Sequence, residues 1–330
     1  MAMTMTGERG DISGQVLGAL REAGAPVSGE SLAASLGISR AAVWKQIQRL
    51  KALGYDIAGE PRRGYRLLAA PDRLYPHEIL HRLGTRRWRG PVVYRTELPS
   101  TNDLAKSLGA QGASEGTLVV AEAQTAGRGR LGRDWLSPPG EGIYVSLILK
   151  PPLPPSELPQ ITLTVAVAVV RALRAAAGVS PGIKWPNDLI LGGKKLGGIL
   201  TEMETESDRI RYVVVGLGLN VNNPQFPPEL SATATSLLRE TGRRVPRAPL
   251  VRAWLEEFET LYDGFSAGNF PEILEEWRHH TVTLGRRVTV RHGNREFHGW
   301  AREVEADGAL LLETEAGETI RVTSGEVAQE

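Results

Sequence analysis

Three amphipathic patterns at helical spacing open the chain. In ISGQVLGALREAG the apolar residues fall on one helical face, and in ISRAAVWKQIQRLKALG Val43, Ile47 and Leu50 do the same. Between them, SGESLAASLG predicts a shorter helix that ends in a left-handed turn at Gly37, and Ser39 is the expected N-cap of the third helix. Helix, short helix, tight turn and basic helix is the order of a helix-turn-helix.

A basic hairpin follows these helices. The segment YDIAGEPRRGYRLL predicts two short strands joined by a basic tip, which is the pattern of a wing. A generic helical bundle with a solvated charged face is the alternative, but the hairpin favours DNA as the partner. We expect contacts to bases from the start of the third helix and to phosphates or the minor groove from the wing, made by Ser39, Arg40, Ala41, Lys45, Arg62 and Arg63.

Short apolar runs then predict strands that end in glycine-rich loops. GTLVVAEAQ and GIYVSLILKP read as strands, and GRGRLGRDW (residues 127–135) joins them. No Lys-Ser or Lys-Thr follows its last glycine and no helix follows the loop, so neither a P-loop nor a dinucleotide fingerprint fits. We expect a mobile loop that closes over an anionic ligand, with a solvated basic loop as the alternative.

Two further glycine-rich turns lie at strand ends. In KWPNDLILGGKKLGGIL a β-hairpin with Gly192–Gly193 at its tip is predicted, with Lys195 on the returning strand. RYVVVGLGLN predicts another strand that ends at Asn220. Ser100 and Thr101 precede a helix, where they could cap it or expose its first amides to a ligand. Glycine-rich turns with cations at several strand ends indicate one pocket.

The rest of the chain alternates between helix and strand signals. The apolar run Ile161–Val170 is too short for a bilayer and predicts a buried helix. Two amphipathic helices follow near residues 247–280, and alternating apolar and polar residues after them predict a small barrel of short strands. His279 and His280 lie at a helix end, with no third ligand at a spacing that would indicate a metal site.

Composition narrows the class of protein. The chain has 330 residues, enough for two or three domains, and a net charge of +1, so nucleic acid must meet a local basic surface. Without cysteine there are no disulfides, thiolate metal sites or cysteine nucleophiles. The amino-terminal residues lack the pattern of a signal peptide, and we expect a cytoplasmic protein that does not engage membranes.

These signals divide the chain into segments. We predict a disordered tail over residues 1–10, a winged helix-turn-helix over 11–69, a linker over 70–76, a ligand-binding catalytic domain over 77–281 and a small β domain over 282–330.

Several motifs together resemble a known family. STN (residues 100–102), QTAGRGRLGR (124–133), KWPND (184–188), KLGGIL (195–200) and GLGLN (216–220) resemble, in order and spacing, the bacterial biotin protein ligases that also act as the biotin operon repressor. The resemblance covers nearly the whole chain. It implies an α+β fold, with a winged helix-turn-helix, a mixed-sheet domain like that of class II synthetases and an SH3-like carboxy-terminal barrel.

The resemblance also implies an activity. Biotin and ATP, with Mg²⁺, would form biotinyl-5′-AMP, and a lysine of a biotin carboxyl carrier domain of acetyl-CoA carboxylase would then accept the biotin. No protein nucleophile is required, so catalysis would rest on positioning and charge neutralisation. Binding of the adenylate would favour a homodimer that represses biotin genes at a two-fold operator.

Site residues follow from the matching motifs. The resemblance implies that ten residues contact biotin: Ser100, Thr101, Asn102, Gln124, Arg128, Gly129, Arg130, Lys195, Gly198 and Gly218. It places at ATP Arg128, Arg130, Lys184, Asn187, Asp188, Lys195 and Asn220, with Asp188 also near Mg²⁺. The catalytic cations would be Lys195, Arg130, Arg128 and Lys184.

Two departures from the family pattern and two alternatives remain. Leu131 stands where a further arginine is common, and we expect it to pack when the loop closes. The carboxy-terminal tail offers no basic residue for the nucleotide, so no ATP role is expected there.

The alternative functions are two. A lipoate or octanoate ligase would lack the winged helix, and a ligand-sensing repressor without ligase activity is disfavoured by the intact set of cations.

Overall fold

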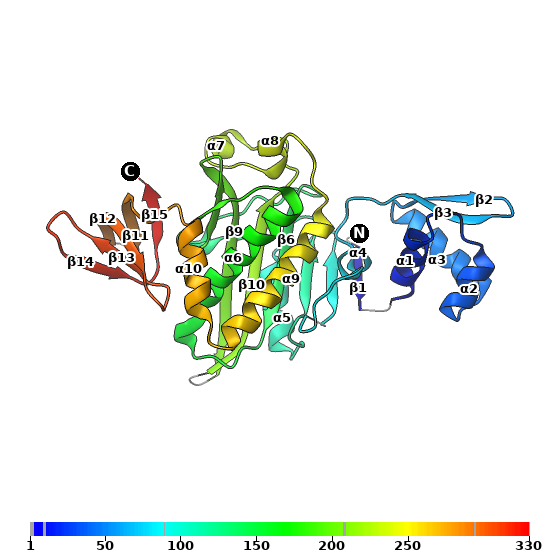
Figure 1. Ribbon diagram of the computed structural model, residues 1–330, viewed down its shortest axis with the longest axis horizontal. Coiled ribbons are helices and arrows are strands. Elements are labelled where there is room, and N and C mark those ends of the chain that lie inside the picture. Colours follow the sequence, from blue (N-terminus) through cyan, green and yellow to red (C-terminus); the bar gives the residue numbers. More distant parts are fainter. Residues whose placement is uncertain (1–2, 9–10, 89, 207–208, 294, 330) are drawn as a thin grey trace.

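The computed structural model describes residues 3–8, 11–88, 90–206, 209–293 and 295–329. Three domains form a row, with the amino-terminal helices at one end, a large sheet with its helices in the middle and a small β domain at the other end (Figure 1). The α+β architecture expected from the sequence is confirmed.

The amino-terminal domain is a three-helix unit followed by a hairpin. Its elements are α1 (Ile12–Glu22), α2 (Gly29–Leu36), α3 (Arg40–Ala52), β2 (Asp56–Glu60) and β3 (Gly64–Ala69). Val43, Ile47 and Leu50 are fully buried, as their spacing predicts. Ser39 Oγ accepts a hydrogen bond from the Ala42 amide at 3.1 Å and caps α3.

An eight-stranded mixed sheet forms the middle domain, in the order β1-β4-β5-β6-β10-β9-β8-β7. Only β4 and β5 pair in parallel among these strands as described. The elements are β1 (Thr4–Gly7), α4 (Pro76–Leu80), β4 (Val92–Arg95), α5 (Thr101–Ala110), β5 (Leu118–Ala121), η1 (Arg130–Gly132), β6 (Gly142–Leu149), η2 (Pro155–Glu157), α6 (Leu158–Ala177), β7 (Gly182–Lys184), β8 (Asp188–Leu191), β9 (Lys194–Glu206), β10 (Arg209–Asn220), α7 (Pro228–Ser231), α8 (Leu237–Thr241), α9 (Arg247–Ser266) and α10 (Phe270–His280).

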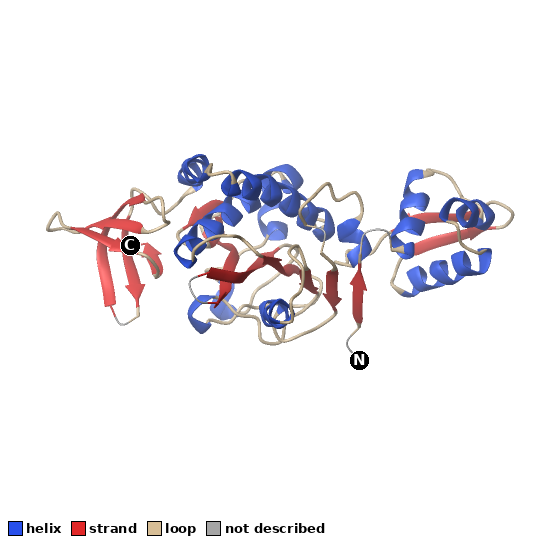
Figure 2. Ribbon diagram, turned by 90° about the horizontal axis from the view of Figure 1, so that it is seen from below, coloured by secondary structure: helices blue, strands red, loops and turns tan. Residues whose placement is uncertain are grey.

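Helices cover both faces of this sheet, but unequally. Helices α6, α9 and α10 pack on one face, while α5 covers part of the other, where loops gather (Figures 1 and 2). The segment Pro155–Ala177 is long and apolar enough to cross a membrane by length and composition, but 72% of its apolar window is buried. Trp254 and Phe258 of α9 stack at 6.1 Å inside the core, as expected.

The amino-terminal segment corrects one expectation. Residues 1–10 were expected to be disordered, but Thr4–Gly7 form β1 at the edge of the sheet, antiparallel to β4. The Met3 amide also donates to Thr96 Oγ1 at 2.9 Å. A Cβ on Gly7 would lie 2.4 Å from Pro76 Cβ, so only glycine permits this approach. Residues 1, 2, 9 and 10 of the predicted tail lie outside the described residues.

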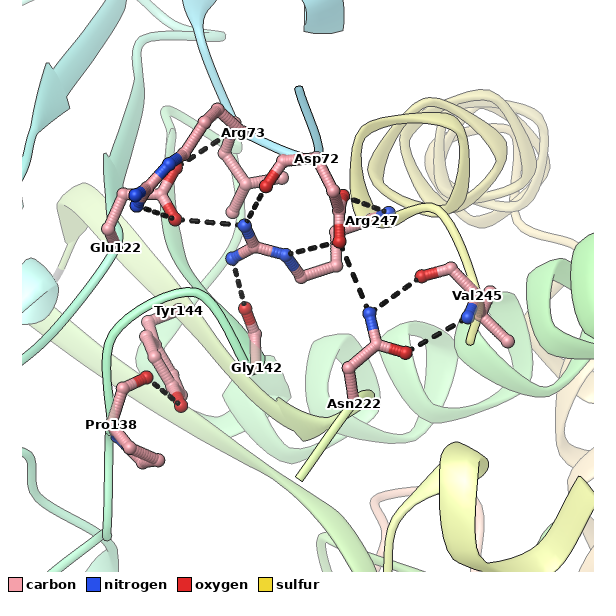
Figure 3. Close-up of polar contacts among 10 residues, drawn as sticks. Asp72, Arg73, Glu122, Pro138, Gly142, Tyr144, Asn222, Val245 and Arg247 are labelled. Carbon is pink, nitrogen blue, oxygen red and sulfur yellow. Dashed lines mark hydrogen bonds and ion pairs between the residues drawn. The ribbon is translucent and has the colours of Figure 1, made fainter. Parts of the chain in front are cut away.

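The predicted linker is held against the middle domain. Arg247, which is fully buried, donates from Nε to Asp72 Oδ2 at 3.2 Å and from Nη2 to Glu122 Oε2 at 2.9 Å (Figure 3). Asn222 donates to the same Asp72 oxygen at 3.2 Å, and Glu122 accepts from the Leu74 amide at 2.8 Å. The linker therefore carries specific polar anchors to β5 and α9.

A second polar cluster joins the two domains directly. Tyr55 donates its hydroxyl hydrogen to Glu78 at 2.5 Å and lies 2.7 Å from His77 Nε2, so that nitrogen carries the hydrogen toward the tyrosine oxygen. Arg21 pairs with Glu78 at 2.6 Å. Burial lowers the pKa of His77 to about 4, which keeps the imidazole neutral at pH 7.

The carboxy-terminal domain is a five-stranded antiparallel sheet in the order β14-β13-β12-β11-β15. Its strands are β11 (Arg287–His292), β12 (Arg295–Val304), β13 (Leu310–Glu313), β14 (Thr319–Val322) and β15 (Glu326–Gln329). Trp185 of the middle domain donates its indole hydrogen to the Gly308 carbonyl at 3.0 Å, and Gln160 donates to the Ala306 carbonyl at 2.9 Å. These bonds seat the small domain on the middle one.

Candidate active site

A cavity of about 630 Å³ lies where the ends of the central strands meet the loop of residues 127–135. Its volume is in the range of small-molecule sites. Every residue that the sequence placed at biotin or ATP lines it, including Ser100, Gln124, Arg130, Lys195 and Gly218. The structure thus brings these residues together, while their individual ligands remain predictions.

A buried polar floor lies at the start of α5. The Thr101 amide and hydroxyl both donate to Gln124 Oε1, at 2.8 and 3.1 Å. Ser146 Oγ on β6 lies 2.8 Å from Thr101 Oγ1 and 2.6 Å from Asn102 Oδ1. Ser100 occupies the N-cap position but makes no side-chain capping bond, so the capping interpretation is wrong in its detail. Gln124 satisfies this helix amide instead.

A network of charges extends the floor toward β9. Asn102 Nδ2 donates to Glu202 at 2.8 Å, and Lys106 Nζ donates to the other carboxylate oxygen at 2.7 Å. Burial alone would raise the pKa of Glu202, but these two hydrogen bonds lower it below its usual value. Asp103 pairs with Lys106 at 3.4 Å and also with Arg128 of the loop. Helix α5 therefore contacts the loop through a salt bridge.

The loop itself folds as a compact hairpin. The Gly129 amide donates to the Arg133 carbonyl at 2.7 Å, and the Trp135 amide donates to the Gly127 carbonyl at 2.8 Å. Arg130 Nη1 lies 3.3 Å from Asn187 Oδ1, and burial lowers the pKa of Arg130. The loop thus presents its half-buried Arg130 to the cavity.

Leu131 lies at a turn of the loop. It has a φ of 56°, in the left-handed region, and is 71% exposed. The expectation that it packs when the loop closes over a ligand stays a prediction.

Lysines complete the basic wall. Lys195 Nζ pairs with Asp188 at 2.7 Å and lies 5.6 Å from the centre of the Trp135 ring. Burial lowers the pKa of Lys184; the Asp188 carboxylate opposes this shift and repulsion from Lys195 adds to it. The charged residues that line the cavity are Arg128, Arg130, Arg133, Lys184, Lys195 and Arg291, against Asp134, Asp188 and Glu326. The excess of cations suits a ligand with several negative charges.

Glycines on β10 make room for the neighbouring side chains. A Cβ on Gly216 would lie 2.2 Å from Asn102 Oδ1, and one on Gly218 would lie 2.6 Å from the Trp135 ring. On β9, Gly197 is needed mainly for the approach of β10, while Gly198 faces the cavity. Of these two glycines, Gly198 alone lines the cavity.

The small domain also contributes to the cavity. Arg291 on β11 and residues 325–328 line it, and Arg133 pairs with Glu326. Sequence reasoning missed Arg291, which lies on β11 ahead of the tail. The expectation that the tail has no role at ATP stays a prediction. Ser146, Trp135 and Glu202 were missed as well. A single serine among the apolar residues of GIYVSLIL was the available signal for Ser146.

Comparison with known sequences identifies the family. Residues 92–220 match the Biotin/lipoate A/B protein ligase family, 13–66 match an HTH domain, and 283–328 match the Biotin protein ligase C terminal domain. The Bifunctional ligase/repressor BirA of Bacillus subtilis is 43% identical, over 88% of this chain and 90% of that protein. The chain belongs to the biotin protein ligase family.

A second sequence relative and a solved structure support the same family assignment. BirA of Escherichia coli is 31% identical over 87% of this chain and 88% of that protein. The structure of a biotin protein ligase from Aquifex aeolicus, in complex with biotin and ATP, is 31% identical and superposes with a TM-score of 0.62, covering 72% of this chain and 98% of that one.

The HTH domain of this ligase presents a basic surface. Arg40, Ala41 and Lys45 on α3 are exposed, as is Ser39 before them. At the wing tip Arg62 has a φ of 65°, and the neighbouring arginine, Arg63, pairs with Glu60 at 2.8 Å. The structure thus leaves the predicted DNA-binding residues accessible.

Mg²⁺ has no prearranged protein site here. The part of the chain that the structure describes contains no group of three or more His, Cys, Asp or Glu residues that could hold a metal ion. Asp188, the predicted ligand, already pairs with Lys195. One carboxylate engaged by a cation does not fit a resident metal centre.

Proposed function

We propose that this chain is a biotin protein ligase that forms biotinyl-5′-AMP and transfers biotin to a lysine of a biotin carboxyl carrier domain. The observation that carries the proposal is the cavity, in which a neutral polar floor lies beside a wall of cations. Such a cavity matches a ligand with an uncharged polar ring at one end and phosphates at the other.

The floor favours biotin over lipoate or octanoate. Thr101, Asn102, Gln124 and Ser146 offer both hydrogen-bond donors and acceptors. A ureido ring has two N–H donors and one carbonyl acceptor and can pair with such groups. The dithiolane of lipoate and the alkyl chain of octanoate have neither, so they would leave buried polar groups unpaired.

The wall favours adenylate formation. In the first step a biotin carboxylate oxygen attacks the α-phosphorus of ATP, and pyrophosphate leaves. Repulsion between the two anions opposes this attack, and Lys195 and Arg130 would offset it at the carboxylate and the α-phosphoryl oxygens. Lys184 and Arg128 would neutralise the rest of the nucleotide. Asp188 would orient the Lys195 ammonium through their ion pair. ATP would enter as its Mg²⁺ complex, and the metal would offset part of the phosphate charge.

In the second step the amine of a carrier lysine attacks the mixed anhydride. An amide forms and AMP leaves, so the protein needs no covalent intermediate. The loop of residues 127–135 would shield the reactive anhydride from water until the carrier arrives. Its salt bridge to Asp103 ties it to α5 of the same domain, and its contact with Glu326 ties it to the small domain.

We also propose that the chain represses transcription as a homodimer in the cytoplasm. The HTH match over residues 13–66 supports DNA binding, and Ser39, Arg40, Ala41, Lys45, Arg62 and Arg63 would make the contacts. Between Thr201 and Glu206, β9 has β10 as its one strand partner in the described part of the sheet, which leaves an edge for a second copy. Adenylate binding would favour the dimer by linkage.

Biotin-dependent exchange of pyrophosphate into ATP tests the enzymatic proposal. We expect exchange with biotin and none with lipoate or octanoate. Exchange with lipoate alone would move the activity to the other branch of the family, and no exchange with any acid would leave a ligand-sensing repressor. A gel shift with DNA from upstream of biotin genes, with and without biotin and ATP, tests repression separately.

A further inference from the structure

The outer surface of α3 carries an aromatic residue that the fold does not use. Val43, Ile47 and Leu50 point into the domain, and Gln46 accepts a hydrogen bond from Ser13 of α1 at 3.0 Å. Trp44 is on neither of these contacts. Its side chain is 57% exposed, more than any other described tryptophan, the next being Trp300 at 43%.

Trp44 lies among the residues expected to meet DNA. It is one helical turn after Arg40 and three residues after Ala41, so the three side chains share a strip of the helix surface. Lys45 is next to it in sequence and also exposed, as is Gln48 one turn later. This strip, Arg40, Ala41, Trp44, Lys45 and Gln48, is here called the α3 strip. It combines cations with a large apolar ring.

The chemistry of the α3 strip indicates its partner. The cations suit phosphates, which line both sides of a DNA groove. An indole ring has no acceptor, and its apolar face has one counterpart on the edges of base pairs in the major groove, the methyl group of thymine. A site on a protein partner would instead be expected to lack lysine next to its aromatic anchor and to gather further apolar residues around it.

We propose that Trp44 determines operator specificity by packing against thymine methyl groups in the major groove. The proposal rests on the DNA-binding part of the proposed function and adds a base preference to it. The cations of the strip hold the helix on the backbone, while Trp44 distinguishes thymine from the bases that lack a methyl group.

Deoxyuridine provides the test because it differs from thymidine only by this methyl group. Full-length protein with biotin, ATP and Mg²⁺ first selects its site from a random duplex pool. Thymines of the selected site are then replaced singly by deoxyuridine, and the affinity is measured for the wild type, Trp44→Ala and Trp44→Phe. Trp300→Ala, at an exposed tryptophan of the small domain, is the matched control.

We expect at least one thymine per half-site at which loss of the methyl weakens wild-type binding by about fourfold, the value of one buried methyl group. Trp44→Ala should bind the thymine site more weakly and no longer respond to deoxyuridine. Trp44→Phe should keep part of the response, and Trp300→Ala should behave as wild type. Biotin-dependent ATP exchange by each variant confirms that it is folded.

Two results would overturn the proposal. If deoxyuridine weakens wild type and Trp44→Ala by the same factor, another residue reads the methyl group. If no substitution affects the wild type, no methyl group is read. A pool that yields no selected sequence would instead contradict DNA binding itself, and the base preference would fall with it.

Discussion

Replacing Arg247 by methionine tests the polar anchor between the linker and the middle domain. The guanidinium is fully buried and bonds to Asp72, Glu122 and the Gly142 carbonyl, the last at 3.0 Å (Figure 3). Methionine fills much of the same volume but supplies no charge. Glu122 is only 1% exposed. Without Arg247 it would still accept the hydrogen bond from the Leu74 amide. It would also still have Arg73 at 3.5 Å, but that side chain is 44% exposed.

The expected cost follows from the charge left behind. Removing one partner of a buried ion pair typically destabilises a protein by about 3–5 kcal/mol. Because Arg73 remains as a partial partner, we expect the lower end, about 3 kcal/mol. Arg247→Lys keeps the charge but loses the planar guanidinium that bonds two carboxylates, so its loss of stability should lie between those of the wild type and Arg247→Met.

Urea unfolding followed by tryptophan fluorescence provides the assay, since Trp88, Trp254 and Trp277 are buried in the middle domain. The double variant Arg247→Met with Glu122→Gln removes the fully buried carboxylate and leaves only Asp72, whose side chain is 32% exposed, without the guanidinium, so it should lose less stability than the sum of the single variants. Strict additivity, or a loss below about 1 kcal/mol for Arg247→Met, would show that the cluster is not an electrostatic anchor.

Four further predictions concern the site and its neighbours. Lys195→Gln should slow adenylate formation by about 10- to 150-fold, the kinetic equivalent of losing a charge-assisted hydrogen bond of about 1.5–3 kcal/mol. Lys194→Gln, the control, should leave the rate unchanged. Equal rates for the two variants would contradict the role assigned to Lys195. His77 is neutral in the fold, with a pKa of about 4, so its full contribution to the free energy of unfolding is present above pH 6.5. Because protonation then favours the unfolded chain, the free energy of unfolding should fall by about 3 kcal/mol toward pH 4. His77→Gln should lack this component in urea titrations, and an unchanged pH profile would count against the buried imidazole. Trypsin cleavage near Arg130 should slow when biotin and ATP are added, and an unaltered cleavage rate would refute closure of the loop. Arg62→Ala should reduce the salt slope of DNA binding by about one unit, and an unmoved slope would exclude a phosphate contact there.

Local patterns were sufficient for much of the fold. The period of apolar residues placed α1, α3 and α9, and the capping role of Ser39 followed from residue type alone. Glycine-rich turns at strand ends also located the cavity, because several such turns in one domain can converge at one edge of a sheet. These signals lie within a few residues of the structure that they determine.

Long-range contacts were beyond this reasoning. Strand β1 has the sequence TMTG, in which threonine and methionine alternate over too few residues to predict a strand, and it depends on the edge of β4, far along the chain. Glu202, Arg291 and Arg247 are ordinary charged residues in sequence. Their positions depend on tertiary packing, which brings Glu202 of β9 and Arg291 of the small domain to the site and Arg247 of α9 to the linker.

The central claim is that the residues around Lys195 join biotin to a carrier lysine through an adenylate. The most direct measurement is the intact mass of a biotin carboxyl carrier domain after incubation with the full chain, biotin, ATP and Mg²⁺. We predict a gain of one biotinyl group, with release of AMP and pyrophosphate and with no gain when ATP is omitted. An unchanged mass, for a carrier that an established biotin ligase does modify, would contradict the account.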